Sequence, residues 1–173
     1  KKKNVLFLSL VLPVLVYSHS FVITGSVPDL TIYKDAFYEI KNLDILDSNV
    51  IDYLNVNYKF EYGYIVLMKC WGIISDNFNL FLCVSSCFLF FFYTKTILRY
   101  SPNVGVSILI FLAIIFDQSL FVLRQHLSIA IILLSIPYII ERNLPKFLLI
   151  LFIVFLFHKS SLIWGGVYFF YGF

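Results

Sequence analysis

Charged residues are scarce in this 173-residue chain: Asp, Glu, Lys and Arg together make up 13% of it, whereas an average soluble domain has about 25%. Hydrophobic residues make up 61%, aromatic residues 20%, and the mean hydropathy is +0.91. A small globule keeps much of its area exposed, so its interior has no room for such an excess of apolar side chains. The composition therefore disfavours a soluble enzyme, a disordered tail and a nucleic-acid-binding module, and it favours a membrane protein.

Several short catalytic motifs are also missing. The chain contains no glycine-rich phosphate loop, no Gly-x-Ser-x-Gly and no His-Glu-x-x-His. Cysteines number only three, and two of them, Cys83 and Cys87, lie four positions apart in an apolar run. Because that run holds no His or carboxylate, packing explains this pair better than the alternative of a metal site.

Long apolar runs are what the chain has in abundance. A helix needs about 20 apolar residues to cross about 30 Å of hydrocarbon, and these runs are continuously apolar rather than alternating. We predict an all-α, polytopic membrane domain over residues 1–173, with short or broken helices near the outer face. Its predicted spans are Val5–Thr24, Phe78–Thr94, Val104–Leu123, Leu127–Ile140, Phe147–Phe157 and Leu162–Phe173.

The two ends of the chain carry expectations of their own. The sequence begins with Lys1–Lys3 and no Met, and it stops at Phe173 within an apolar run. We expect it to be the N-terminal part of a longer protein. No small-residue cleavage site follows the first apolar run, so residues 5–24 are expected to form a retained span rather than a signal peptide.

An acidic segment over residues 26–61 holds seven of the ten acidic residues, opposed by three lysines. We predict an extracytoplasmic loop there with a helix near Ile32–Lys41, although a solvated face alone would also explain the acidity. The next segment, residues 62–75, is short and contains Lys69. It is predicted to lie at the membrane interface or to enter the membrane only in part, so that residues 78–173 hold the remaining spans.

Cytoplasmic loops collect Lys and Arg. This rule places the N-terminus in the cytoplasm and the acidic segment outside. If residues 62–75 do not cross, the later basic residues also fall inside; these are Lys95, Arg99, Arg142 and Lys146. The same topology places Arg124 and His158 at the outer end of their spans.

Those two residues belong to the polar runs Arg124–His126 and His158–Ser161, each of which precedes a predicted helix. Helix N-termini present free N–H groups and a positive dipole end, and Ser160 or Ser161 is a suitable cap. Arg and His at membrane depth mark sites more often than not. We predict an anion site for a phosphate or diphosphate headgroup. Alternatively, Arg124 and Lys159 extend to lipid headgroups and His158 lies in a polar kink.

At these residues the sequence resembles the EpsG family of Wzy-type bacterial polysaccharide polymerases. Leu123–Ala130 (LRQHLSIA) is similar to a helix start in that family, and Phe157–Ile163 (FHKSSLI) is similar to its Phe-His-x-Ser run. The resemblance covers roughly Asp29 to Tyr168, in the same order along the chain. The further similar segments are Pro28–Tyr33, Phe60–Tyr64, Tyr138–Asn143 and Lys146-Phe147.

The resemblance implies a glycosyltransferase of the bacterial inner membrane that needs no metal or other cofactor. It would join undecaprenyl-diphosphate-linked oligosaccharide repeats on the periplasmic or exterior side, in O-antigen, capsule or exopolysaccharide synthesis. Its partners would be the lipid-linked donor and acceptor, the bilayer, and a chain-length regulator and flippase of the same pathway, with no nucleic acid.

Site roles also follow from the resemblance. Arg124 and His158 would bind the diphosphate with support from Gln125 and Lys159, and His158 would also take part in catalysis. Glu61 or Asp29 would act as the base or as a ligand of a sugar hydroxyl. The alternatives are a ligase that uses the same lipid donor, a transporter or flippase for a lipid-linked glycan, and a non-catalytic membrane subunit.

Overall fold

The structure is a computed structural model of the chain, and it describes residues 12–18 and 28–171. Within these ranges every regular element is helical, which confirms the predicted fold class. Lys1–Lys3 and most of the predicted first span lie outside the described residues, and 12–18 form a helical segment.

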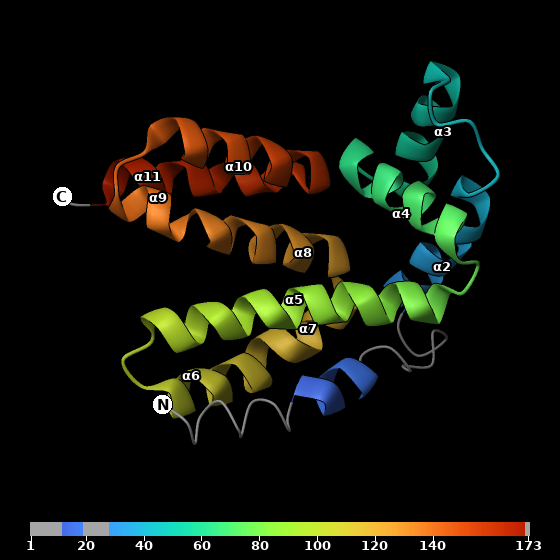
Figure 1. Cartoon of the computed structure of the whole chain (residues 1–173). Helices are drawn as coiled ribbons and strands as arrows, with labels where there is room; N and C mark the ends of the chain where they lie inside the picture. The colour runs from blue at the N-terminus through green and yellow to red at the C-terminus, as the bar shows by residue number, and fades with distance from the viewer. Residues whose placement is uncertain (1–11, 19–27, 172–173) are drawn as a thin grey trace.

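The second half of the chain runs back and forth as an antiparallel bundle (Figure 1). Asparagine side chains begin three of its helices: Asn77, Asn103 and Asn143 each accept a hydrogen bond from a backbone N–H three residues later, as N-caps do. The bundle elements are α5 (Phe78–Tyr100), α6 (Val104–Ile110), η2 (Phe111–Phe116), α7 (Asp117–Phe121), α8 (Leu123–Ile132), η3 (Leu133–Ser135), α9 (Ile136–Ile140), α10 (Leu144–Phe157), η4 (Lys159–Trp164) and α11 (Gly165–Phe170).

Two of these helices have the length and composition of membrane spans. They are α5, with 23 residues, and the continuous helix Leu123–Ile140, with 18 residues. Shorter apolar helices accompany them, and bulky apolar side chains such as Leu149 and Phe152 on α10 are exposed. Surfaces of this kind are stable in hydrocarbon, so the structure indicates a membrane location.

The ends of the spans differ from the sequence prediction. The run predicted as Leu127–Ile140 begins at Leu123, because Arg124, Gln125 and His126 continue the helix rather than connect to it. A criterion based on apolar runs stops at the first polar residue, although Arg, Gln and His are all compatible with a helix. The predicted span Val104–Leu123 contains a π-helical turn and ends at Phe121.

Later elements differ in the same way. The helix predicted to begin at Phe147 begins at Leu144, where Pro145 occupies the first turn and Asn143 caps it. The predicted span Leu162–Phe173 is divided between the 3₁₀-helix η4 and the short α11. Ser161 is buried in η4 and its N–H donates to the His158 carbonyl, so the predicted serine cap gives way to a 3₁₀ turn.

Three helices gather at one end of the bundle, on the right in Figure 1: α2 (Pro28–Ile40), α3 (Ser48–Tyr58) and α4 (Tyr62–Ile74). The predicted helix near Ile32–Lys41 corresponds to α2, and the acidic segment contains α3 as well. Fully buried aromatic residues pack these helices against α5, among them Phe37, Tyr64 and Phe81. This aromatic core positions the three helices α2, α3 and α4, together called the end cap, over the bundle.

Lysine 69 explains how α4 joins the end cap. Its ammonium group donates to the carbonyls of Lys41 (2.8 Å) and Leu43 (2.7 Å), at the end of α2. Cations stabilise the free carbonyls of a helix C-terminus. Lys69, whose charge disfavours a simple membrane span over residues 62–75, therefore ties α4 to α2. Whether α4 lies at the membrane interface stays a prediction.

Gly63 brings α4 into backbone contact with α10. A Cβ added at Gly63 would lie 2.7 Å from the Leu156 carbonyl oxygen and 2.9 Å from the Leu156 carbonyl carbon. Real Cβ atoms do not approach backbone that closely, so only glycine allows this packing. The contact matters because Glu61 lies two residues before Gly63 and His158 two residues after Leu156.

We expect Gly63→Ala to lower the free energy of unfolding by about 1–3 kcal/mol, because the added methyl group forces α4 away from α10. Gly166→Ala is the matched control, since the nearest heavy atom to its added Cβ lies 3.7 Å away, in Phe170. Thermal unfolding in detergent measures both. Equal stability of the two variants would show that the α4–α10 contact is not as close as described.

Candidate functional site

Four residues that the sequence analysis selected meet at the capped end of the bundle. Glu61 precedes α4, Arg124 lies in the first turn of α8, and His158 and Lys159 join α10 to η4. They are brought together because α8 begins and α10 ends at this end of the bundle, where α4 packs against α10 (Figure 1). The two predicted cationic residues therefore share one site.

The Glu61 carboxylate is the centre of this cluster. Its Oε2 accepts a hydrogen bond from Arg124 Nη1 at 2.5 Å, and its Oε1 accepts one from the backbone N–H of Lys159 at 3.2 Å. His158 Nδ1 lies 3.5 Å from the same Oε1. The Glu61 side chain is only 10% exposed and that of Arg124 18%. A buried ion pair of this kind needs both partners, because either charge alone would be uncompensated.

The guanidinium group of Arg124 is also held from its other sides. Nη1 donates to the Lys59 carbonyl at 2.7 Å, and the group lies over the ring of Phe60 at 4.6 Å and over that of Tyr33 at 6.0 Å. Lys59 ends α3 in the left-handed region, with φ 52°. Cation–π contacts and two acceptors keep the guanidinium in one orientation.

Two polar atoms of the cluster are buried without a hydrogen-bond partner: Arg124 Nε and His158 Nδ1. The 3.5 Å between Nδ1 and Glu61 is longer than an ordinary hydrogen bond. Arginine has five N–H donors in a planar fork, and the Glu61 and Lys59 contacts use only Nη1. Buried polar atoms are nearly always paired, so unpaired ones call for an explanation such as a ligand. The site therefore retains an unpaired guanidinium donor, which suits an anion.

Two tyrosines border Arg124. Burial raises the pKa of Tyr33, as does the charge of Asp29, while the positive charge of Arg124 opposes that rise. Tyr33 is therefore a neutral phenol at physiological pH. Tyr64 is fully buried and its hydroxyl has no hydrogen-bond partner. Neither Tyr33 nor Phe60 was assigned a role from the sequence, although both lie in segments that resemble the family.

Not every predicted residue joins the cluster. Gln125 is exposed, because one helical step of about 100° turns it away from Arg124. His126 is buried against α5, with its Nδ1 3.2 Å from the Tyr93 hydroxyl. Asp29 lies in the first turn of α2, and its charge acts on Tyr33. Lys159 contributes its backbone N–H while its side chain is exposed.

Metal ligands are not grouped in the part of the chain that the structure describes: residues 12–18 and 28–171 contain no set of three or more His, Cys, Asp or Glu side chains arranged for a metal ion. Cys83 and Cys87 both lie on α5, and both are free thiols. The cluster itself offers a carboxylate, an imidazole, a guanidinium and neutral phenols.

An apolar cavity of about 300 Å³ lies next to the cluster, between α4, α5, α8 and α10. Phe157, the neighbour of His158, and Leu127, one turn beyond Arg124, form part of its wall. Trp71 also lines it, and the indole N–H of Trp71 is buried without a partner. Charged donors and apolar space thus adjoin at this end of the bundle.

Comparison with known proteins supports the resemblance noted in the sequence. The model of the EpsG family matches residues 4–173, which is nearly the whole chain and includes all four residues of the cluster. Comparisons with curated proteins and with solved structures find no match. A match of this extent places the chain in a family of membrane proteins for exopolysaccharide biosynthesis: the chain belongs to the EpsG family.

Proposed function

We propose that this protein is a polysaccharide polymerase that joins undecaprenyl-diphosphate-linked oligosaccharide repeats at the outer face of the bacterial inner membrane. The observation that carries the proposal is the buried cluster in which Glu61 holds Arg124 beside His158 while Arg124 Nε and His158 Nδ1 remain unpaired. A diphosphate is the anion that such a cluster suits, and exopolysaccharide biosynthesis is the family's role.

The reaction transfers a growing glycan from one lipid diphosphate to the next lipid-linked repeat. An acceptor hydroxyl attacks the anomeric carbon of the donor, a C–O bond forms, and the bond between the sugar and the diphosphate breaks. Negative charge develops on the departing diphosphate. Donors that are already oriented stabilise such charge without reorganising, and Arg124 is held in place by Glu61, the Lys59 carbonyl and the Phe60 ring.

Roles for the cluster follow from these contacts. Arg124 binds the diphosphate through its free Nε edge, and His158 binds it or takes the proton of the acceptor hydroxyl. Glu61 stabilises the protonated His158, because its Oε1 lies 3.5 Å from Nδ1. Its direct contacts support Glu61 over Asp29 as the carboxylate closest to the chemistry. The backbone N–H of Lys159 supports the site by donating to Glu61. Gln125 is exposed, so its proposed role is to contact the sugar rather than the diphosphate.

The apolar cavity beside the cluster supports a lipid-linked substrate. A polyprenyl diphosphate has a charged head next to a long apolar chain. The cavity wall formed by Phe157, Leu127 and Trp71 begins where the charged donors end. The first part of the polyprenyl chain would lie in this cavity, and the rest would continue into the bilayer.

Reconstitution tests the proposal directly. The purified protein is placed in lipid nanodiscs with lipid-linked repeats prepared from cells that make the polymer, and products are separated by gel electrophoresis. We expect a ladder of products, each one repeat longer than the last and still attached to lipid; nanodiscs without protein are the control. Transfer of preformed glycan to a different acceptor without lengthening would identify a ligase instead. If the protein in lipid vesicles moves the lipid-linked repeat from one leaflet to the other without forming any new bond, it would be a transporter.

A further inference from the structure

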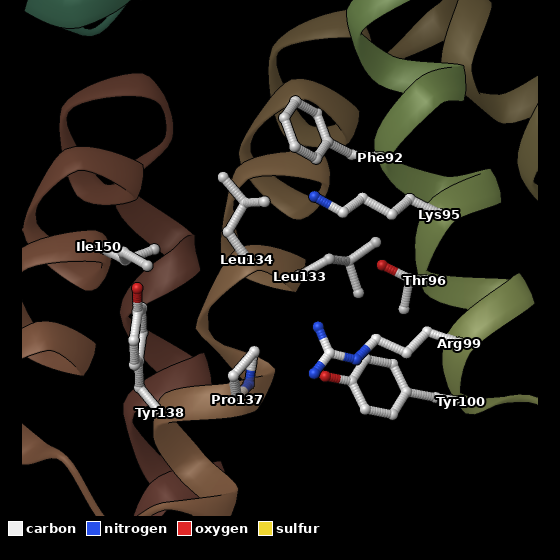
Figure 2. Close-up of a pocket in the computed structure, with 10 residues that line it drawn as sticks. All are labelled: Phe92, Lys95, Thr96, Arg99, Tyr100, Leu133, Leu134, Pro137, Tyr138 and Ile150. Atoms are coloured by element: carbon white, nitrogen blue, oxygen red, sulfur yellow. The ribbon is translucent and has the colours of Figure 1, made fainter.

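A second cavity lies at the opposite end of the bundle from the Glu61 cluster. It has a volume of about 330 Å³ and is enclosed by the end of α5, by η3 and α9, and by α10 (Figure 2). Volumes of this size are at the lower end of those that bind small ligands. None of its lining residues belongs to the Glu61 cluster.

Two cations from α5 reach into this cavity. Lys95 and Arg99 are four positions apart, so they share one helix face, and Figure 2 shows both side chains extending towards Leu133 and Pro137. Their positive charges are not neutralised by protein: within residues 12–18 and 28–171, no carboxylate oxygen lies within 4.0 Å of either group. Aromatic rings flank them instead, with Lys95 5.9 Å from the Phe92 ring and Arg99 5.3 Å from the Tyr100 ring.

A third cation, Lys146, lies at the same end of the bundle but outside the lining of the cavity. Lys146 is positioned over the ring of Tyr138, at 5.4 Å from the centroid, and Tyr138 lines the cavity. Arg142, which lies between α9 and α10, is already engaged because its guanidinium donates to the carbonyls of Tyr168 and Tyr171. Lys95 and Arg99, which both line the cavity, repel each other unless an anion is present. The C-terminal dipole of α5 favours cations there, but it does not account for a cavity between them.

The remaining wall of the cavity is apolar. Leu133, Leu134 and Ile150 face the cations, and Thr96 and Tyr138 supply hydroxyl groups (Figure 2). A ligand that fits must therefore combine a negative group with an apolar part. Lys and Arg between membrane helices commonly bind the phosphate of lipid headgroups, and the arginine fork matches phosphate oxygens.

We propose that this cavity binds the phosphate group of an anionic lipid, with Lys95 and Arg99 as its ligands and Leu134 and Ile150 against the first carbons of its chains. The lipid would come from the membrane leaflet at that end of the bundle. This site is separate from the Glu61 cluster and does not depend on the proposed polymerase activity.

Native mass spectrometry of the protein released from nanodiscs tests the proposal. The probes are phosphatidylglycerol, zwitterionic phosphatidylcholine and inorganic phosphate. We expect phosphatidylglycerol to be retained, and we expect retention to fall about tenfold or more in Lys95→Gln and in Arg99→Gln, each made alone. Lys146→Gln is the matched control, with the same charge change at the same end but outside the lining, and it should change retention less than about twofold.

A second variant separates the cavity from general attraction between cations and the membrane. Leu134→Trp fills the cavity and leaves every charge in place, so it should also abolish retention. Equal weakening by Lys146→Gln, or full retention by Leu134→Trp, would overturn the proposal and leave only surface attraction. If inorganic phosphate is retained by the protein and phosphatidylglycerol is not, the ligand of the cavity would be a soluble phosphate and not a lipid. Thermal unfolding of each variant confirms that it is folded.

Discussion

Replacement of Arg124 by Ala is expected to abolish polymer longer than one repeat, with a fall in turnover of about 10²–10³-fold. This is the range that follows when a single donor to a developing negative charge is removed. Arg124 is the part of the cluster with a free, buried donor edge, at Nε, and with three groups that hold it in place. Cells that carry only this variant should still display single repeats on the acceptor lipid. The measurement is the gel ladder of lipid-linked products.

Two further variants make this result specific. Arg124→Lys retains the charge opposite Glu61 but lacks the planar fork, so it should preserve stability while it lowers turnover. Lys34→Ala removes a positive charge from α2 at the same end of the protein and should leave the ladder unchanged. Full-length polymer made by Arg124→Ala would refute a role for Arg124 in diphosphate binding. A ladder lost equally in Lys34→Ala would point to net charge at this end instead.

Replacement of Glu61 by Ala should have the largest effect on stability, a loss of about 3–5 kcal/mol in the free energy of unfolding. Without the carboxylate, Arg124 becomes a nearly buried charge without a counter-ion, and the Lys159 N–H loses its acceptor. Glu61→Gln keeps an acceptor for that N–H but removes the ion pair, so its loss should be intermediate. Unfolding by heat or denaturant in detergent micelles measures both variants.

Asp76→Ala provides the matched control for Glu61. Asp76 also forms an ion pair, with Lys41 at 3.0 Å, but its side chain is 74% exposed. Exposed ion pairs contribute about 0–1 kcal/mol, because water and salt screen them. If Glu61→Ala destabilised the protein no more than Asp76→Ala does, the Glu61–Arg124 pair would not be the buried pair described above. The proposed orientation of Arg124 would then lose its basis.

The site shows where inference from sequence stops. The basic members of the cluster were selected from short polar runs at the ends of apolar segments, and Glu61 was selected from the family resemblance. Their pairing was not foreseen: Glu61 meets Arg124 across 63 positions and Lys159 across 98 positions of the chain. Such contacts depend on how α4 packs against α10 and where α8 begins beside them, and local patterns carry no information about that arrangement. Gln125 and His126, adjacent to Arg124 in sequence, are turned elsewhere by the helical register.

Composition and local motifs are enough to show that the chain is helical, that it is suited to hydrocarbon, and that it belongs to the EpsG family. Hydrophobicity and local motifs are properties of neighbouring residues, so they can be recognised without a fold. The packing of the helices was needed to show that Gly63 allows α4 to contact the backbone of α10 and that Glu61 holds Arg124 beside His158. It was also needed to show that Lys95 and Arg99 line a separate cavity. The physical reason is that these features depend on the packing distances between helices, which are set by the sum of many side-chain contacts along the chain.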